Sequence, residues 1–247
     1  MRYTGEEKKY DRSSSAVLRM ILLFLITIFV FSVSFLPSVL IIFLFLFYIF
    51  PIVHIILFIF LLPFILILSF LLLICSTAFF TGIVIKGLNL KYESGKYSKS
   101  IKDKITFKFT LYYTLYRPTE KILSFFFIPP LYARYLKLIG AKIGKNVFFG
   151  GRNTISDPCV LEIGSNTLIG GGATIMGHLG EEKLVIQKVS IGKNCLIGAE
   201  SLIMPGVTME DNVVLGGKSL VTKNKVLKKG NMYGGVPAEL IDRKKSK

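Results

Sequence analysis

His178 is the residue of this chain whose type and position are best suited to chemistry. The sequence contains two histidines, and the other one, His54, lies inside a long apolar tract. His178 stands three residues before Glu181, where ten residues up to Ser190 interrupt a regular repeat. Imidazole titrates near working pH, so it is a suitable general base for a hydroxyl or amine nucleophile. Its position alone is equally consistent with a structural role.

Six-residue units with an apolar first residue surround His178 in the sequence. Twelve such units follow from Ile143, and Gly comes second in seven of them. Their first residues are Ile143, Phe149, Ile155, Ile163, Ile169, Ile175, Ile191, Ile197, Ile203, Met209, Leu215 and Val221. The fifth residue of each unit is mostly small. One large and one small inward residue per six predict one flat face of a triangular coil, and three faces close one turn of a parallel β-helix.

The spacing of these units predicts about four triangular turns. They cover residues 143–160, 163–180, 191–208 and 209–226. Two residues are inserted after the first turn and ten after the second, and inserts in a solenoid become loops on its surface. Both ends of so short a prism need a cover. We expect residues 120–142 to cover the first turn and the tail after Val226 to cover the last.

A membrane-length apolar tract precedes the repeat. No Lys, Arg, Asp or Glu lies between Arg19 and Lys86. A spanning helix needs ~20 apolar residues, so two long or three short spans fit. Basic residues flank both ends, and Lys and Arg beside a span favour the cytoplasmic side, which favours an even number of spans. The sequence predicts an α-helical transmembrane hairpin in the cell membrane, multi-pass, with the termini and the β-helix on the cytoplasmic side. Three spans remain the alternative.

The connector between the two halves mixes aromatic with basic side chains. This composition is typical of helices that lie in the membrane–water interface. The same aromatic residues can also cap the β-helix, and both roles can hold at once. His54 has no acidic partner in the tract, so we interpret it as a neutral residue in the turn of the hairpin. The predicted domains are a cytoplasmic N-terminal segment (1–18), the transmembrane hairpin (19–86), the interfacial connector and cap (87–142), the β-helix (143–230) and a C-terminal tail (231–247).

Charge and cysteine usage agree with this organisation. The formal net charge is +16 and the sequence pI is about 9.7. No nucleic-acid recognition motif accompanies the basic excess, so we expect no nucleic-acid partner and attribute the excess to anionic lipid headgroups and a phosphate-bearing cofactor. The three cysteines form no metal or disulfide pattern and indicate structural thiols in a reducing compartment.

Several segments carry a resemblance to known families. The hexads, the external loop and the closing segment Asn231-Met-Tyr-Gly-Gly-Val-Pro-Ala-Glu resemble the hexapeptide-repeat acyltransferase superfamily. A narrower likeness, to the membrane-linked C-terminal region of polylysine-synthase-type peptide synthetases, rests on Lys91-Tyr-Glu-Ser-Gly-Lys-Tyr, Tyr135-Leu-Lys-Leu-Ile-Gly-Ala-Lys-Ile-Gly, Ser156-Asp-Pro-Cys-Val-Leu-Glu-Ile-Gly and Ala173-Thr-Ile-Met-Gly-His178-Leu. The synthetase domains of that group are absent from the sequence. The resemblance implies a left-handed parallel β-helix, a homotrimer and acyl transfer, commonly of acetyl from acetyl-CoA, with no metal.

The resemblance also implies site residues. His178 matches the base that deprotonates the acceptor. Asp157 matches a recurrent acid that orients the imidazole of a neighbouring subunit or binds an acceptor amine, although an Asp before Pro158 also suits a corner turn. The CoA positions would be Gly198, Ala199, Gly216 and Gly217, with Lys218, Lys223, Lys228 and Lys229 on its phosphates. Such tail lysines are often merely solvated. Asn153 is a loose match for the substrate-binding Asn of sugar acetyltransferases.

Three functions fit these features to different degrees. The first is a membrane acyltransferase using acetyl-CoA or another acyl-CoA, with a small-molecule or lipid-linked acceptor such as a lipid headgroup, a lipid-linked sugar or an amine. The second is a γ-class carbonic anhydrase, which shares the β-helix but needs a zinc usually held by three His. With one His outside the apolar tract, the sequence nearly excludes it. The third is a non-catalytic scaffold that trimerises membrane helices.

Overall fold

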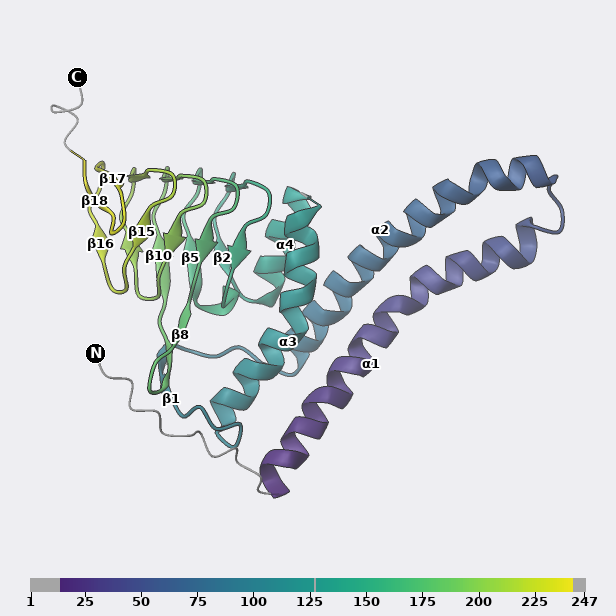
Figure 1. Cartoon of the computed structure of the whole chain (residues 1–247), viewed down its shortest axis with the longest axis horizontal. Coiled ribbons are helices and arrows are strands. Elements are labelled where there is room, and N and C mark those ends of the chain that lie inside the picture. Colours follow the sequence, from purple (N-terminus) through teal and green to yellow (C-terminus); the bar gives the residue numbers. More distant parts are fainter. Residues whose placement is uncertain (1–13, 127, 242–247) are drawn as a thin grey trace.

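A long helical hairpin forms the N-terminal part of the chain. The computed structural model describes residues 14–126 and 128–241. Helix α1 (Ser14–Leu44) continues into a π-helical turn, η1 (Phe45–Ile49), and α2 (Ile55–Gly87) runs back along it. Figure 1 shows the pair extending away from the rest of the molecule. Within the described residues, these are the two helices long and apolar enough to cross a membrane, judged by length and composition alone.

Serine side chains fasten the two helices to each other. The hydroxyls of Ser38 and Ser69 donate to each other's carbonyl oxygens at 2.9 and 3.1 Å, and Ser76 Oγ donates to Ser34 O at 2.6 Å. Hydrogen bonds of this kind add specific contacts between two apolar helices, because apolar packing alone does not fix which residues face each other. His54 caps the second helix, because its Nδ1 accepts from Ile56 N at 3.3 Å.

The connector contains one strand and two helices. They are β1 (Gly95–Tyr97), α3 (Lys104–Phe125) and α4 (Pro129–Ile139). Asp103 caps α3 by accepting from the backbone N–H groups of Ile105 and Thr106, both at 2.9 Å. Helix α4 begins at a proline, which suits the first turn of a helix.

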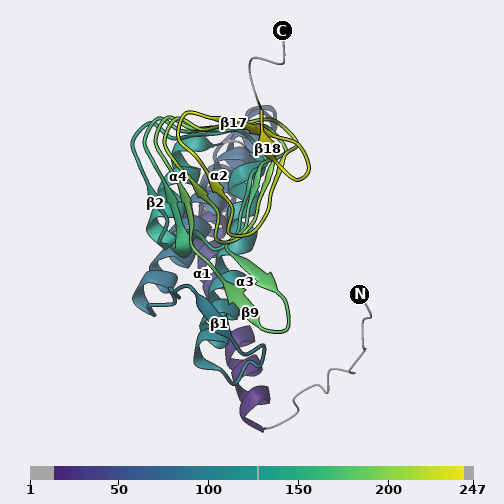
Figure 2. The same cartoon turned by 90° about the vertical axis from the view of Figure 1, so that its left-hand side faces the viewer.

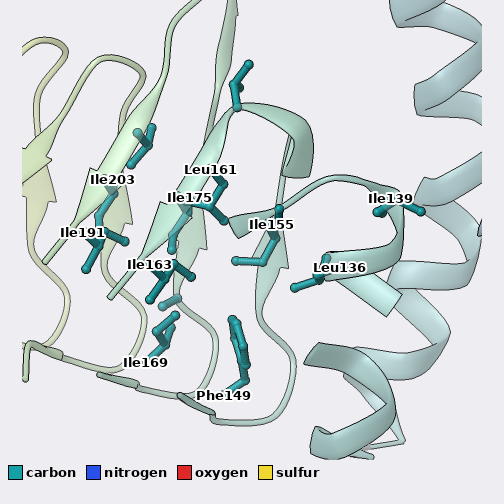
Figure 3. Close-up of a cluster of buried hydrophobic side chains, with 14 of the residues drawn as sticks. Leu136, Ile139, Phe149, Ile155, Leu161, Ile163, Ile169, Ile175, Ile191 and Ile203 are labelled. Atoms are coloured by element: carbon teal, nitrogen blue, oxygen red, sulfur yellow. The ribbon is translucent and has the colours of Figure 1, made fainter. Parts of the chain in front are cut away.

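Helix α4 lies over the open end of the β-helix, at its first turn. Leu136 and Ile139 are fully buried and pack with Phe149 and Ile155 of that turn (Figure 3). A buried acid fixes the same junction. Glu120 of α3 pairs with Arg117 at 2.8 Å, and its Oε1 accepts from the Tyr132 hydroxyl of α4 at 2.8 Å and from Ile155 N at 3.1 Å. Burial raises the pKa of Glu120 above its ordinary value.

Three parallel sheets form the faces of a triangular coil, so the β-helix prediction is confirmed. The first contains β2 (Lys142–Ile143), β5 (Leu161–Ile163), β10 (Val189–Ile191), β13 (Thr208–Met209) and β16 (Val226–Leu227). The second contains β3 (Phe148–Phe149), β6 (Leu168–Ile169), β11 (Leu196–Ile197), β14 (Val214–Leu215) and β17 (Met232–Gly234). The third contains β4 (Thr154–Ile155), β7 (Thr174–Ile175), β12 (Leu202–Ile203) and β15 (Leu220–Val221). As expected, Ile169, Ile197 and Leu215 point inward and are 0% exposed.

The coil extends beyond its predicted C-terminal boundary. Strands β16 and β17 add two faces of a fifth turn, so the predicted boundary between residues 230 and 231 falls inside the coil. Leu227 and Tyr233 keep the six-residue register after Val221 and are buried. Strand β18 (Glu239–Leu240) then folds back antiparallel on β17. Residues 242–247 of the predicted tail and 1–13 of the N-terminal segment lie outside the described residues.

The corners of the coil need residues that accept a left-handed backbone. At the first corner these are Asn146, Asn166, Asn194 and Asn212, all with positive φ. Their side-chain amides form a ladder from turn to turn, with N–O distances of 3.1, 3.3 and 3.2 Å. Asn tolerates this conformation better than most residues, so the ladder stabilises the stacking of the turns.

Candidate active site

His178 lies where the chain leaves the coil at its third corner. It is the first residue of β8 (His178–Gly180), which forms a hairpin with β9 (Leu184–Ile186). Strand β9 also pairs antiparallel with β1 from the connector. The predicted surface loop therefore contains β9, the middle strand of a three-stranded sheet. Figure 2 shows this hairpin standing off the coil beside β1 and α3. The sheet fixes the backbone of His178 to the connector.

Asp157 and His178 form a hydrogen-bonded pair within one chain. His178 Nδ1 lies 2.6 Å from Asp157 Oδ2. The Asp157 side chain is 0% exposed, whereas the His178 side chain is 22% exposed. A carboxylate only accepts, so in the neutral imidazole Nδ1 carries the proton and Nε2 keeps its lone pair. No described residue hydrogen-bonds Nε2. This is the arrangement of a general base oriented by an acid.

The carboxylate of Asp157 is held from several sides. Its Oδ1 accepts from the Tyr92 hydroxyl at 2.5 Å, and its Oδ2 also accepts from Gly177 N at 3.2 Å. The backbone N–H of Asp157 donates to the Tyr116 hydroxyl at 3.2 Å. A Cβ at Gly177 would lie 2.7 Å from Asp157 Cβ, so only glycine fits there. Burial, followed by the charge of Asp157, raises the pKa of Tyr92 well above its ordinary value, which keeps the phenol a donor.

Aromatic rings of α3 form one wall of the site. The Phe109 and Tyr113 rings lie edge-to-face with the His178 imidazole, at centroid distances of 4.9 and 5.8 Å. Arg117 lies over the Tyr113 ring at 5.9 Å. The same helix packs against α2, so one element contacts both the helical hairpin and the candidate base.

Of the predicted site residues, Asp157 and His178 come together. From the sequence, Asp157 is expected against the imidazole of a neighbouring subunit, on an acceptor amine or at a corner turn. In the structure it contacts His178 of its own chain, and it is also a corner residue with a φ of 63°. The spacing contained this signal. Ile155 stands opposite Ile175 in the parallel register, so Asp157 lies beneath Gly177, next to His178.

The predicted CoA residues are spread over all three corners, with Lys223 after β15 at the third corner and Lys228 and Lys229 after β16 at the first. Gly198, Ala199, Gly216, Gly217 and Lys218 stack at the second corner. There, Lys218 N donates to Ala199 O at 2.8 Å, and a Cβ at Gly198 would lie 2.2 Å from Gly217 N. Ala199 and Gly217 are exposed. Within one chain, this corner and the His178 corner bound opposite ends of the third sheet.

Three of the four predicted lysines form ion pairs in the structure, whereas Lys229 donates through its backbone N–H to Glu210 Oε2 at 2.9 Å. Lys218 pairs with Glu200 at 3.7 Å, with both side chains exposed, and Lys223 pairs with Glu181 of the hairpin loop. Lys228 pairs with Glu210 at 3.0 Å. Asn153 has a structural contact, because its Nδ2 donates to Gly170 O at 2.7 Å.

Four residues of the site were not predicted from the sequence. They are Tyr92, Phe109, Tyr113 and Tyr116, which come from the segment after α2 and from α3. Tyr92 lies in a segment already noted for its resemblance, but nothing in its spacing relates it to the third corner. Hexad periodicity is local, whereas the position of α3 on the coil is a tertiary property.

Two of the cavities on the coil lie outside the immediate surroundings of His178. An open groove of about 950 Å³ runs along the first sheet and is lined by Lys142, Glu162, Gly192 and Glu210 among others. A smaller cavity of about 250 Å³ reaches Tyr92 and Cys159. His178 lines neither. The described residues contain no group of three or more His, Cys, Asp or Glu suited to holding a metal ion.

Comparisons with known proteins add the following. Solved structures similar to this chain include a maltose O-acetyltransferase from Clostridium difficile 630, with 17% identity, a TM-score of 0.47, and coverage of 60% of this chain and 91% of that one. A galactoside acetyltransferase in complex with coenzyme A has 22% identity and a TM-score of 0.39, and the match covers 51% of this chain and 77% of that one. A soybean serine acetyltransferase complexed with serine has 17% identity and a TM-score of 0.41, and the match covers 69% of this chain and 56% of that one. The curated proteins contain no match. Residues 188–223 match the family model described as hexapeptide repeat of succinyl-transferase.

Proposed function

We propose that this protein is a membrane-bound acyltransferase that moves an acyl group, acetyl in the simplest case, from a CoA thioester to a hydroxyl or amine. The observation that carries the proposal is the pair formed by His178 and Asp157, with a buried acid on Nδ1 and a partly exposed imidazole whose Nε2 is unbonded among the described residues. The match of residues 188–223 to a hexapeptide-repeat family model supports the reaction class.

The proposed reaction needs one proton acceptor. His178 Nε2 takes the proton of the acceptor hydroxyl or amine as its oxygen or nitrogen attacks the thioester carbonyl. Asp157 stabilises the resulting imidazolium. The tetrahedral oxyanion collapses, the carbon–sulfur bond breaks, and the imidazolium returns the proton to the departing thiolate. Backbone N–H groups near the exposed Ala199 are suited to stabilise the oxyanion when a neighbouring copy brings that corner to His178.

An apolar ladder on the second sheet supports a homotrimer. Phe148, Leu168 and Leu196 point outward in register and are 48%, 42% and 41% exposed, with Val214 and Met232 continuing the ladder. The first sheet presents Lys142, Glu162, Ser190 and Thr208 at the equivalent positions of its first four strands and Val226 on its last. Exposed apolar ladders of this kind are typical of surfaces that other chains cover.

A charge in this ladder tests the assembly. Leu196→Glu should give monomers by mass measurement in detergent, whereas Ser190→Glu on the first sheet should leave the trimer. A wild-type protein that is monomeric and active would remove the site between copies.

The helical hairpin supports placement in a membrane. Most of its large apolar side chains are exposed along both helices, which water does not favour and lipid does. Basic residues at both ends favour a cytoplasmic position for the coil. An alkaline carbonate wash should leave the chain in the membrane pellet, and its release into the supernatant would contradict the proposal.

Transfer from radiolabelled acetyl-CoA into membrane extracts tests the function, because labelled product is counted whatever the acceptor is. His178→Ala should lose ~10²–10⁴-fold in rate while keeping CoA binding by calorimetry. Equal incorporation by both proteins would refute the role of His178. Absence of both incorporation and CoA binding in the wild type would favour the non-catalytic scaffold.

A further inference from the structure

Tyr92 connects the end of the helical hairpin to the candidate catalytic pair. It lies five residues after α2 ends at Gly87, and Leu90 N donates back to Ile85 O at 3.1 Å, so the chain leaves the helix in a fixed direction. The Tyr92 side chain is buried. Its ring packs edge-to-face on Phe109 at 5.3 Å, and its hydroxyl donates to Asp157 Oδ1 at 2.5 Å.

The two oxygens of Asp157 have separate tasks. Oδ2 contacts His178 Nδ1 and Gly177 N, and Oδ1 accepts from Tyr92. Without the Tyr92 hydroxyl, a fully buried carboxylate oxygen would lose its donor, and such a loss is relieved by rotation of the carboxylate or by a change of its partners. Either response changes the group that holds His178 Nδ1.

Neighbouring titratable groups do not substitute for this contact. Those that surround Asp157 are Tyr112 and Tyr116 of α3, Cys159 beside the corner, and His178 itself. Burial raises the pKa of Tyr112 and Tyr116 well above the ordinary value and that of Cys159 to about 11, so all three are neutral at working pH. Of these three, only Tyr116 hydrogen-bonds Asp157, and it does so at the backbone N–H.

We infer that Tyr92 is a positioning residue for the acyl transfer proposed above: its hydroxyl fixes the Asp157 carboxylate and thereby the orientation and tautomer of His178. The base thus depends on the segment that leaves the second long helix. The inference rests on the proposed function for its effect on rate, and on the structure alone for its effect on the imidazole.

Tyr112 provides a matched control. It is also a buried tyrosine, its ring lies 5.3 Å from that of Tyr92, and its hydroxyl donates to Ile139 O at 3.0 Å without hydrogen-bonding Asp157. Tyr112→Phe removes one buried hydroxyl from the same cluster. Any effect of general loosening should therefore appear in both variants.

The two histidines allow a direct reading of the tautomer. In full-length protein labelled with 15N in the imidazole rings, His178 should appear as the Nδ1–H form. His54 should appear as the Nε2–H form, because its Nδ1 accepts from Ile56 N. At a pH where both rings are neutral, Tyr92→Phe should replace the single His178 form by a mixture and leave His54 unchanged. Tyr112→Phe should match the wild type.

Rates provide the second measurement. Transfer from radiolabelled acetyl-CoA should fall about tenfold in Tyr92→Phe, with acetyl-CoA KM unchanged, and less than about twofold in Tyr112→Phe. Site-specific 3-fluorotyrosine at position 92 keeps the ring and hydroxyl, so it covers the case in which Tyr92→Phe does not fold. It should shift the His178 nitrogens.

The outcomes separate the inference from the proposed function. A folded Tyr92→Phe protein with wild-type His178 signals, or a 3-fluorotyrosine protein whose His178 signals do not move, would overturn the positioning role. If the imidazole responds as expected but His178→Ala transfers acetyl as fast as the wild type, the proposed function fails and the positioning role stands.

Discussion

Replacing Asp157 by Asn should remove the charge behind His178 and keep its shape. Asp157 has a φ of 63°, a left-handed conformation that Asn tolerates better than most residues, so the corner should keep its backbone. The amide oxygen can still accept from His178 and Gly177, with the NH2 group turned toward the Tyr92 hydroxyl. What is lost is the negative charge that stabilises the imidazolium.

The size of the effect follows from the contact. A hydrogen bond to a charged group contributes about 1.5–3 kcal/mol, and a neutral one about 0.5–1.5 kcal/mol. The difference of about 1–2 kcal/mol applies once the imidazolium forms, and the full burial of Asp157 favours the upper end. Since about 1.36 kcal/mol is tenfold in rate, Asp157→Asn should lower kcat by roughly 10- to 30-fold. This is less than the ~10²–10⁴-fold expected for loss of the base.

The assay is transfer from saturating radiolabelled acetyl-CoA, with thermal melting in detergent as a check on folding. Asp211→Asn is the matched control, because Asp211 caps a corner of the same coil by accepting from Lys193 N at 2.7 Å and does not contact His178. A natively folded Asp157→Asn protein with the wild-type kcat would refute the reasoning. So would equal losses in Asp157→Asn and Asp211→Asn.

Two other predictions concern the cap and the thiol beside the site. Glu120→Ala leaves Arg117 unpaired and removes the acceptor of the Tyr132 hydroxyl, so the free energy of unfolding should fall by about 3–5 kcal/mol. Glu162→Ala, at a more exposed ion pair, should change it by no more than about 1 kcal/mol; equal denaturation midpoints would contradict the role of the cap. Burial raises the pKa of Cys159 to about 11, so its reactive thiolate should appear only as pH rises toward that value. Iodoacetamide labelling followed by mass spectrometry should be slow at pH 7, and fast labelling there would show that the site opens.

The coil could be predicted from the sequence because each hexad places one apolar side chain inward by local geometry. Ile169, Ile197 and Leu215 are buried as their positions require. The fifth turn was missed because Leu227 and Tyr233 continue the register through a segment interpreted as a tail. The six-residue spacing of inward residues continues after the Ile and Gly signature of the hexads ends, so the spacing alone could have predicted the fifth turn.

The candidate site was only partly predictable. The spacing from Asp157 to His178 nearly equals one turn, so their contact follows from stacking once the turn length is known. The contacts of Tyr116 and Phe109 depend on how α3 packs on the third corner, and those of Tyr92 on how the segment after α2 packs there. No sequence period encodes either. The predicted CoA residues Ala199 and Gly217 lie at a different corner from His178, so the proposed function requires a second copy of the chain to bring them together.

A structure of the assembled protein with CoA tests the central claim most directly. The position of the CoA sulfur relative to His178 Nε2 is the quantity to measure. We expect the sulfur within about 3–4 Å of Nε2, with the backbone N–H of Ala199 of the partner subunit facing the thioester position. CoA bound with its sulfur at any corner other than that of His178 would contradict the account.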